Sequence, residues 1–137
     1  MKINYWLMKS EPSSWSWENQ VKDGIAMWDG VRNYQARNNM MKMKKKDLSF
    51  FYHSVLEKSI IGVVEIVKEF YPDPTDITGK FVVVDVKTKY KLKKPVTLEQ
   101  IKNNKKIKNI ALVKQSRLSV MPIRKSEWLN IIKISEQ

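Results

Sequence analysis

The fold of this chain is constrained most by a regular alternation of apolar and polar residues from Phe81 to Leu92. Successive side chains of a strand point to opposite faces, so a period of two residues predicts a strand with one buried and one solvated face. Outward lysines also discourage pairing with another chain, which is typical of an exposed sheet edge. The expected core face carries Val82, Val84, Val86, Thr88, Tyr90 and Leu92, and the expected outer face carries Asp85, Lys87, Lys89, Lys91 and Lys93.

Three further segments predict strands from their composition. Tyr5–Lys9 is short and mostly apolar, and Leu48–Ser54 is a continuous, aromatic run. Ile60–Val67 is the next apolar run, and Gly62 within it predicts a bulge or bend of the kind that a tightly curved sheet needs. A shorter extended piece is expected at Ile25–Trp28.

Capping residues predict where the helices begin. Ser16 is expected to cap a helix that Gly24 ends, and Asn33 is expected to cap the next. Thr97 precedes a short helix, and Ser126 precedes a last amphipathic helix. The residues expected to face the core are Trp15, Trp17 and Val21 in the loop and helix from Ser13 to Gly24, Ala36, Met40 and Met41 in the second helix, and Trp128, Leu129, Ile131 and Ile132 in the last.

This order of elements predicts an α+β fold. Several strands of similar length with a bend at Gly62 indicate a small closed or half-closed β-barrel with short helices around it. A chain of 137 residues suffices for one hydrophobic core, and the sequence contains no internal repeat, linker or low-complexity tail. We therefore expect residues 1–137 to form a single domain.

The composition excludes several classes of site and favours a polyanionic partner. The sequence has no cysteine and only one histidine, His53, which argues against thiolate or histidine-rich metal sites and against a thiol nucleophile. No apolar run is long enough to span a bilayer and the first residues lack a signal-peptide pattern, so we expect a cytoplasmic protein in a bacterium or a nuclear one in a eukaryote. The net charge of +12 favours nucleic acid, although A·T-rich coding would also enrich lysine.

Four polar segments are more specific than core packing requires. They are Lys9–Pro12, Trp28–Asn38, Phe51–Ser54 and Gln115–Pro122, of which the second reads WDGVRNYQARN. With KSEP before it and FFYHS after it, this pattern resembles the EVE domain family over essentially the whole chain. Two departures lie outside these segments: the family usually has tryptophan in place of Phe81, and it favours a glycine turn where this chain has Lys44, Lys45 and Lys46.

The resemblance implies a PUA-like fold, which is a strongly curved and mostly antiparallel β-barrel with flanking helices. It also implies a non-catalytic reader of nucleic acid with a pocket for a modified base, most simply a modified cytosine in DNA rather than RNA. No cofactor is implied, and a reader without a catalytic site of its own would act through an effector protein.

The residue types in the four segments suit such a pocket. Trp28 is the leading candidate to stack on the base, with Tyr52 second. Glu11 can accept a hydrogen bond from the exocyclic amine of cytosine. The other candidates are polar groups for the base edge (Ser10, Asn33, Asn38, Ser54 and Ser119), cations for a phosphate or carbonyl (Lys9, Arg37 and Arg117), further phosphate contacts (Arg32, Lys44, Lys45 and Lys46), and an apolar niche for a methyl group (Val31, Ala36 or Val120).

Each of these roles has a structural alternative. Trp28 and Tyr52 can belong to the core, the arginines can pair with Glu11 or Asp29, and Glu11 can cap a helix. Lysines at the end of a helix also complement its dipole without binding anything. His53 is expected to be a structural hydrogen-bonding group of its strand.

Three functions remain open at this stage. The first is the modified-base reader, and the second is an RNA-binding or RNA-modification-associated PUA-like protein. The third is a nucleic-acid-modifying enzyme, although the motifs contain no metal triad, activated nucleophile or convergent pair of carboxylates. A basic binder without base selectivity would show a steep salt dependence and no preference among modified bases.

Overall fold

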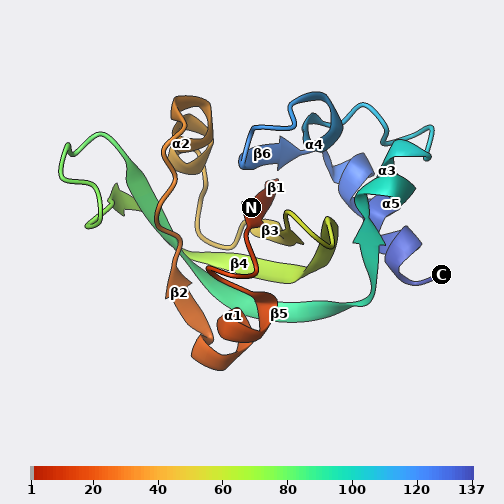
Figure 1. The fold of residues 1–137 in the computed structure, drawn as a ribbon, viewed down its shortest axis with the longest axis horizontal. Helices are drawn as coiled ribbons and strands as arrows, with labels where there is room; N and C mark the ends of the chain where they lie inside the picture. Colours follow the sequence, from red (N-terminus) through yellow and green to blue (C-terminus); the bar gives the residue numbers. More distant parts are fainter. Residues whose placement is uncertain (1) are drawn as a thin grey trace.

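The computed structural model describes residues 2–137, and within them one six-stranded sheet is flanked by five short helices (Figure 1). The strands are β1 (Tyr5–Ser10), β2 (Ile25–Met27), β3 (Leu48–His53), β4 (Ser59–Pro72), β5 (Val82–Thr97) and β6 (Val120–Ile123); the helices are α1 (Trp17–Asp23), α2 (Tyr34–Met41), α3 (Leu98–Lys102), α4 (Ala111–Lys114) and α5 (Lys125–Ser135). In Figure 1 the long ribbons of β4 and β5 bend beneath β1, β3 and β6, with α2 at one end and α3, α4 and α5 gathered at the other.

The sheet is mixed and open. Its strand order is β2-β5-β4-β3-β1-β6. β1 pairs in parallel with β3, with Tyr5 opposite Leu48, and the other four pairings are antiparallel. The predicted α+β class with a curved, mostly antiparallel sheet is therefore confirmed. The strands do not close into a complete barrel, because β2 and β6 are the outer strands and do not pair with each other.

β4 and β5 are longer than the sequence predicts. They pair from Ser59 opposite Thr97 to Pro72 opposite Val82, with register shifts along the way. One shift lies between Ile60 and Gly62, which confirms the bulge predicted at this glycine. Bulges increase local twist, so one long hairpin can curve under the whole molecule.

The outward lysines of β5 lie where the strand loses its second neighbour. β2 pairs with β5 only from Asp85 to Lys87, and the Thr88 amide donates to the Gly24 carbonyl just before β2, so the residues beyond Thr88 pair on one side alone, with β4. This agrees with the expected protection of a sheet edge. Tyr90, predicted to face the core, is instead 44% exposed, because the alternation lapses in this half of the strand.

The capping predictions are confirmed for three helices. Ser16 accepts a hydrogen bond from the backbone of Asn19, Asn33 from that of Ala36, and Thr97 from that of Gln100. The last helix begins earlier than predicted, with Arg124 rather than Ser126 at its N-cap, and α4 was not predicted as a helix. The remaining corrections concern helix faces: Val21, Met41 and Leu129 are exposed, because each short helix turns only a narrow stripe toward the sheet.

The core lies between the sheet and the helices that cover it. Phe50 of β3 stacks on Trp128 of α5, with ring centroids 3.7 Å apart. Pro122 lies within β6, which it can do because β6 is an edge strand. No helix among residues 2–137 has the length and apolar character needed to cross a bilayer.

Candidate nucleic-acid interface

A cavity of about 750 Å³ opens beyond the C-terminal end of β1. Two of the four predicted motifs, Lys9–Pro12 and Trp28–Asn38, meet there. The volume lies in the range usual for small-ligand sites. The residues around the cavity are Lys9, Ser10, Glu11, Ser14, Trp15, Asp23, Ile25, Ala26, Met27, Trp28, Asp29 and Gly30.

The other two motifs hold the end of β1 in place from its two sides, because β1 lies between β3 and β6. The Ser10 carbonyl accepts hydrogen bonds from the Ser54 amide at 3.0 Å and the Ser54 hydroxyl at 3.3 Å. The Lys9 amide donates to the Ser119 carbonyl at 2.8 Å, and Lys9 Nζ donates to the Ser116 carbonyl at 2.8 Å. Ser54 and Ser119 thus support the cavity without lining it, and Arg117 is exposed on the same loop as Ser116.

Two indoles line the cavity. Trp28 is only 7% exposed and packs edge-to-face on Phe51, with ring centroids 5.5 Å apart. It is therefore part of the core as well as part of the wall. Trp15 is half-buried, and its indole N–H donates to Gln20 Oε1 at 3.0 Å. The sequence predicted Trp15 as a core residue, and its nearness to the Lys9–Pro12 motif was the signal for a role at the pocket.

Charged groups of both signs line the same cavity. Glu11, Asp23 and Asp29 supply carboxylates, which can only accept hydrogen bonds when ionised. Lys9 supplies an ammonium group, and burial lowers its pKa. A ligand edge with one amine donor and neighbouring acceptors matches this arrangement, and cytosine has such an edge.

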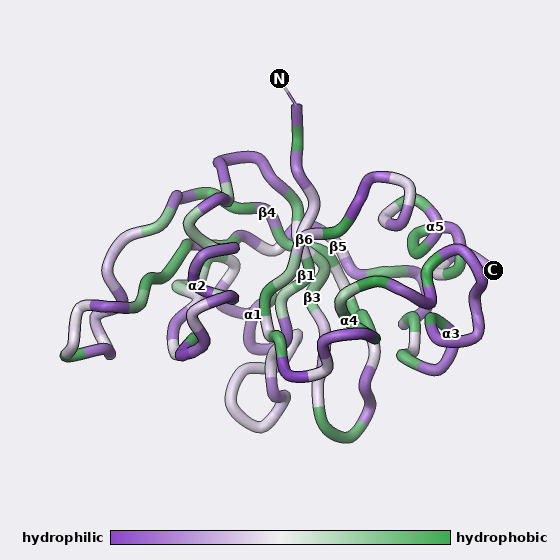
Figure 2. Tube along the Cα trace, turned by 90° about the horizontal axis from the view of Figure 1, so that it is seen from above, coloured by the Kyte–Doolittle hydropathy of each residue, from purple (hydrophilic) through white to green (hydrophobic). Residues whose placement is uncertain are grey.

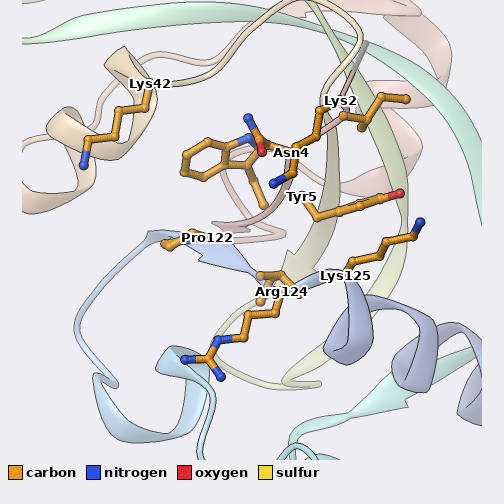
Figure 3. A pocket seen from close by; sticks show the side chains of 10 residues that line it. Lys2, Asn4, Tyr5, Lys42, Pro122, Arg124 and Lys125 are labelled. Atoms are coloured by element: carbon orange, nitrogen blue, oxygen red, sulfur yellow. The ribbon is translucent and has the colours of Figure 1, made fainter.

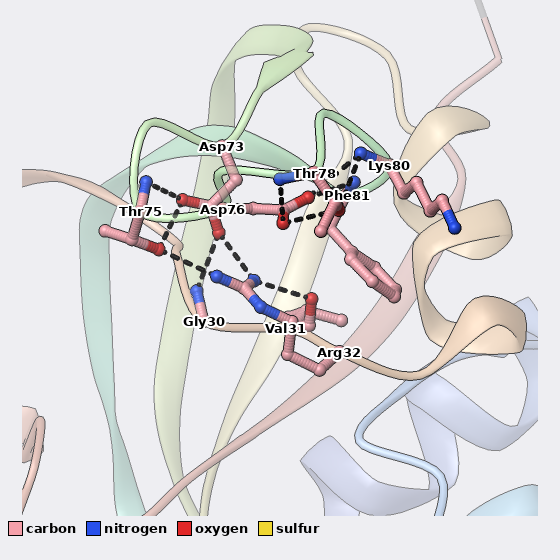
Figure 4. A network of polar contacts seen from close by, with 9 residues as sticks. All are labelled: Gly30, Val31, Arg32, Asp73, Thr75, Asp76, Thr78, Lys80 and Phe81. Carbon is pink, nitrogen blue, oxygen red and sulfur yellow. Dashed lines mark hydrogen bonds and ion pairs between the residues drawn. The ribbon is translucent and has the colours of Figure 1, made fainter.

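The Gly30 turn is fixed to the loop between β4 and β5 (Figure 4). The Gly30 amide donates to Asp73 Oδ2 at 3.0 Å, and Arg32 Nη1 donates to the same oxygen at 2.9 Å. Arg32 Nη2 also donates to Thr75 Oγ1 at 3.0 Å, and the guanidinium lies over the ring of Phe81. Arg32, expected at a phosphate, is thus engaged in an ion pair, with a partner that the sequence did not indicate.

Asp73 is the centre of this network and is 2% exposed. Burial raises its pKa, but the hydrogen bonds from Thr75, Gly30 and Arg32 together outweigh burial and lower the pKa to about 2. Asp73 is therefore ionised at neutral pH. It holds the wall of the cavity at Gly30, although it does not line the cavity itself.

The other candidates on and before α2 lie outside the cavity. Asn33 caps the helix, its Oδ1 accepting from the Ala36 amide at 2.9 Å, and Ala36 is completely buried. Arg37 donates to Asn38 Oδ1 at 2.8 Å and to the Lys80 carbonyl at 3.1 Å. Val31 is 7% exposed and belongs to the core. These residues position the segment after Gly30 rather than forming its pocket surface.

The aromatic and histidine candidates of β3 are also buried. Tyr52 is 3% exposed, and burial raises its pKa to about 12. Nε2 of His53 accepts a hydrogen bond from the Trp17 amide at 3.0 Å, which agrees with the structural role expected for it. Burial lowers the pKa of His53, while Glu57 and Glu18 oppose that effect.

The basic run Lys44–Lys46 lies at the opposite end of β3 from the cavity. The run precedes Leu48, where β3 begins, whereas Ser54 follows its last residue. A six-residue strand separates the two ends by about 20 Å. Because of this separation, the turn is a basic surface distinct from the cavity. Within the turn, Lys44 Nζ lies 4.0 Å from Glu69 Oε1.

A second cavity, of about 770 Å³, lies at the N-terminal end of β1 (Figure 3). Figure 3 shows Lys2, Lys42, Arg124 and Lys125 around it, with the ring of Tyr5 beside them. Its lining holds no carboxylate among residues 2–137, in contrast to the cavity at the other end of the strand.

Comparison with known proteins identifies the family. The family model of the EVE domain matches residues 4–134. The chain belongs to the EVE domain family. This EVE domain is 35% identical to thymocyte nuclear protein 1 of Mus musculus over 172 aligned positions, which cover 97% of this chain and 74% of the mouse protein.

Solved structures of similar proteins have the same fold. Rpa0253 from Rhodopseudomonas palustris superposes with a TM-score of 0.92 at 48% identity, covering 98% of this chain and 94% of that one. Human THYN1 in complex with 5-methylcytosine-containing DNA superposes with a TM-score of 0.85 at 32% identity, covering 98% of both chains. The predicted family resemblance is therefore confirmed.

Proposed function

We propose that this EVE domain is a non-catalytic reader of DNA that carries a modified cytosine, and that the base enters the cavity at the C-terminal end of β1. The observation that carries the proposal is the human relative bound to 5-methylcytosine-containing DNA, which superposes over 98% of both chains. The indoles and carboxylates that line the cavity support the same ligand.

A base must leave its stack before a pocket can read it, which costs a few kcal/mol. Stacking on an aromatic face returns about 1–3 kcal/mol per base. Trp15 and Trp28 are our candidates for that face because both line the cavity. Trp28→Ala is a poor test of stacking, because removing a buried tryptophan costs about 3–5 kcal/mol of stability.

Hydrogen bonds to the base edge would supply the remaining selectivity. Glu11 or Asp29 would accept from the exocyclic amine of cytosine, and Lys9 would donate to an acceptor on the ring. The methyl group would contact Ile25 or Met27, which line the cavity. The niche first expected at Val31, Ala36 or Val120 is filled by the core.

The test is a binding titration with matched oligonucleotides at fixed salt. Single- and double-stranded DNA and RNA would carry cytosine, 5-methylcytosine, 5-hydroxymethylcytosine or N6-methyladenine at one position. We expect at least about a tenfold preference for modified cytosine in DNA, equivalent to about 1.4 kcal/mol. Equal affinities would contradict a reader, and tighter binding to RNA would favour the RNA-binding alternative.

A variant of Glu11 separates a reader from an enzyme. Glu11→Gln should weaken binding to the modified base while the oligonucleotide returns chemically unchanged from both proteins. Glu99→Gln, on the exposed face of α3, is the matched control and should bind as the parent does. A modified oligonucleotide altered by the parent but not by Glu11→Gln would contradict the reader and identify Glu11 as an acid or base.

Three wider expectations belong to the same proposal. Residues 1–137 act as one reading domain, and an effector protein supplies the consequence of binding. The compartment is nuclear in a eukaryote, as the name of the mouse relative suggests, and cytoplasmic in a bacterium.

A further inference from the structure

The turn between β3 and β4 carries two exposed apolar side chains at its tip. Val55 is 56% exposed and Leu56 is 92% exposed. Single exposed apolar residues are common and need no explanation. The conformation and the position of this pair distinguish it.

The backbone at Val55 is strained. Its φ of +79° lies in the left-handed region, which a β-branched side chain rarely adopts. Such conformations persist only when the surrounding structure enforces them, and they concentrate at functional sites. Here the strained residue lies at the projecting end of the hairpin, immediately before Leu56.

This turn is tied directly to the rim of the cavity. Ser54, which precedes Val55, makes two hydrogen bonds to the carbonyl of Ser10, and Ser10 lines the cavity. His53, the last residue of β3, accepts a hydrogen bond from the amide of Trp17, the first residue of α1. In Figure 2 the turn forms a hydrophobic tip, coloured green, that projects from the same edge of the molecule as the loop between β1 and α1.

We propose that Leu56, supported by Val55, is a wedge that enters the base stack of duplex DNA when the modified base moves into the cavity. The inference rests on the proposed function, because only an extruded base leaves a gap in the stack. In other DNA-binding proteins, apolar side chains including leucine are inserted as wedges between base steps. A leucine on a turn that is hydrogen-bonded to the rim of the cavity can fill the gap while the base occupies the pocket.

A wedge has a consequence that an ordinary contact lacks. It stabilises the extruded base only where a second strand and a continuous stack exist. In a single strand the base is already unstacked, so the wedge has little to replace. Loss of Leu56 should therefore weaken binding to duplex DNA far more than binding to the same modified strand alone.

The experiment compares Leu56→Ser with the parent on one 5-methylcytosine oligonucleotide, both as duplex and as single strand. We expect about a tenfold loss of affinity for the duplex and less than about a twofold loss for the single strand. When the parent binds the duplex, a 2-aminopurine next to the modified base should become more fluorescent. With Leu56→Ser this increase should be lost. Leu129→Ser, at a leucine on α5 that is 55% exposed, is the control and should leave both affinities unchanged.

Each other outcome counts against the wedge. Equal losses for duplex and single strand would make Leu56 an ordinary contact, and unchanged duplex affinity with unchanged 2-aminopurine fluorescence would remove it from the interface. If the parent itself shows no preference for the modified duplex, the proposed function fails, whatever the variant does. Because Leu56 is almost fully exposed, the variant should keep the melting temperature of the parent, which is measured alongside.

Discussion

Trp17 lies directly against Gly62: a β-carbon at position 62 would stand 2.4 Å from Cη2 of the indole. The glycine lies at a register shift of β4, and the tryptophan begins α1. The bend in the sheet and the position of α1 are therefore coupled. Since the loop before α1 carries Trp15 and part of the cavity, this contact also places the candidate site.

Gly62→Ala should destabilise the fold by about 1–3 kcal/mol, because the added methyl group overpacks the contact with the indole. Urea denaturation measures the change in the free energy of unfolding. In a Trp17→Phe background the same substitution should cost less, because the smaller ring leaves room for the methyl group. An equal cost in both backgrounds would show that the backbone of β4, rather than the indole, requires glycine at this position.

Asp73 should make the fold sensitive to acid. Its pKa is lowered from 3.8 to about 2 in the folded protein, so its ionised form contributes about 2 kcal/mol above pH 4. That contribution is lost as the pH falls from about 4 to about 2, because the unfolded chain then binds the proton more readily. Asp73→Asn should lower the free energy of unfolding at pH 7 and flatten its dependence on pH in this window.

Asp76 is the control for this prediction. Its pKa is also lowered to about 2, chiefly by the hydroxyl of Thr78, so it titrates in the same window. Asp76 does not contact the Gly30 turn, whereas Asp73 holds it. Asp73→Asn should therefore weaken binding of methylated DNA, and Asp76→Asn should not. Equal effects of the two variants on affinity would contradict a positioning role for Asp73.

Val55→Asn should raise the stability of the protein by about 1 kcal/mol, because asparagine tolerates the left-handed conformation that valine resists. The melting temperature measures this change. Lys46, with a φ of +78°, is the comparison, and Lys46→Asn should give a smaller gain because lysine is not β-branched. A lower melting temperature for Val55→Asn would mean that the valine side chain stabilises the turn despite its backbone.

Features that depend on neighbours in sequence could be predicted. The helix caps at Ser16, Asn33 and Thr97 follow from a hydrogen bond that each side chain makes within three residues. The bulge at Gly62 follows from one residue type within an apolar run. Local patterns also predicted the α+β class and a closed or half-closed barrel, whereas the PUA-like identity of the fold and the expected ligand class came from the family resemblance.

Features that depend on long-range contacts could not be predicted. Arg32 was expected at a phosphate, but Asp73 lies 41 residues away and no local pattern pairs the two. The sequence predicts both Trp28 and Ala36 of the WDGVRNYQARN motif at the pocket, whereas the chain turns at Gly30, so that Trp28 lines the cavity and Ala36 lies in the core. The residue types of the motif do not predict this division, because the packing of α2 against the sheet decides it.

The positions of the basic residues predict two kinds of salt dependence. A duplex of about 8 base pairs centred on the modified base reaches about 14 Å to either side, less than the length of β3 that separates the cavity from Lys44–Lys46. Arg117 is exposed next to Ser116, whose carbonyl accepts a hydrogen bond from Lys9 of the cavity, so we expect it to contact the short duplex. Arg117→Gln should therefore flatten the slope of log affinity against log salt by up to about 0.9. Replacing all three lysines by glutamine should flatten the slope only for a duplex of about 24 base pairs, and an equal effect on the short duplex would place these lysines beside the pocket.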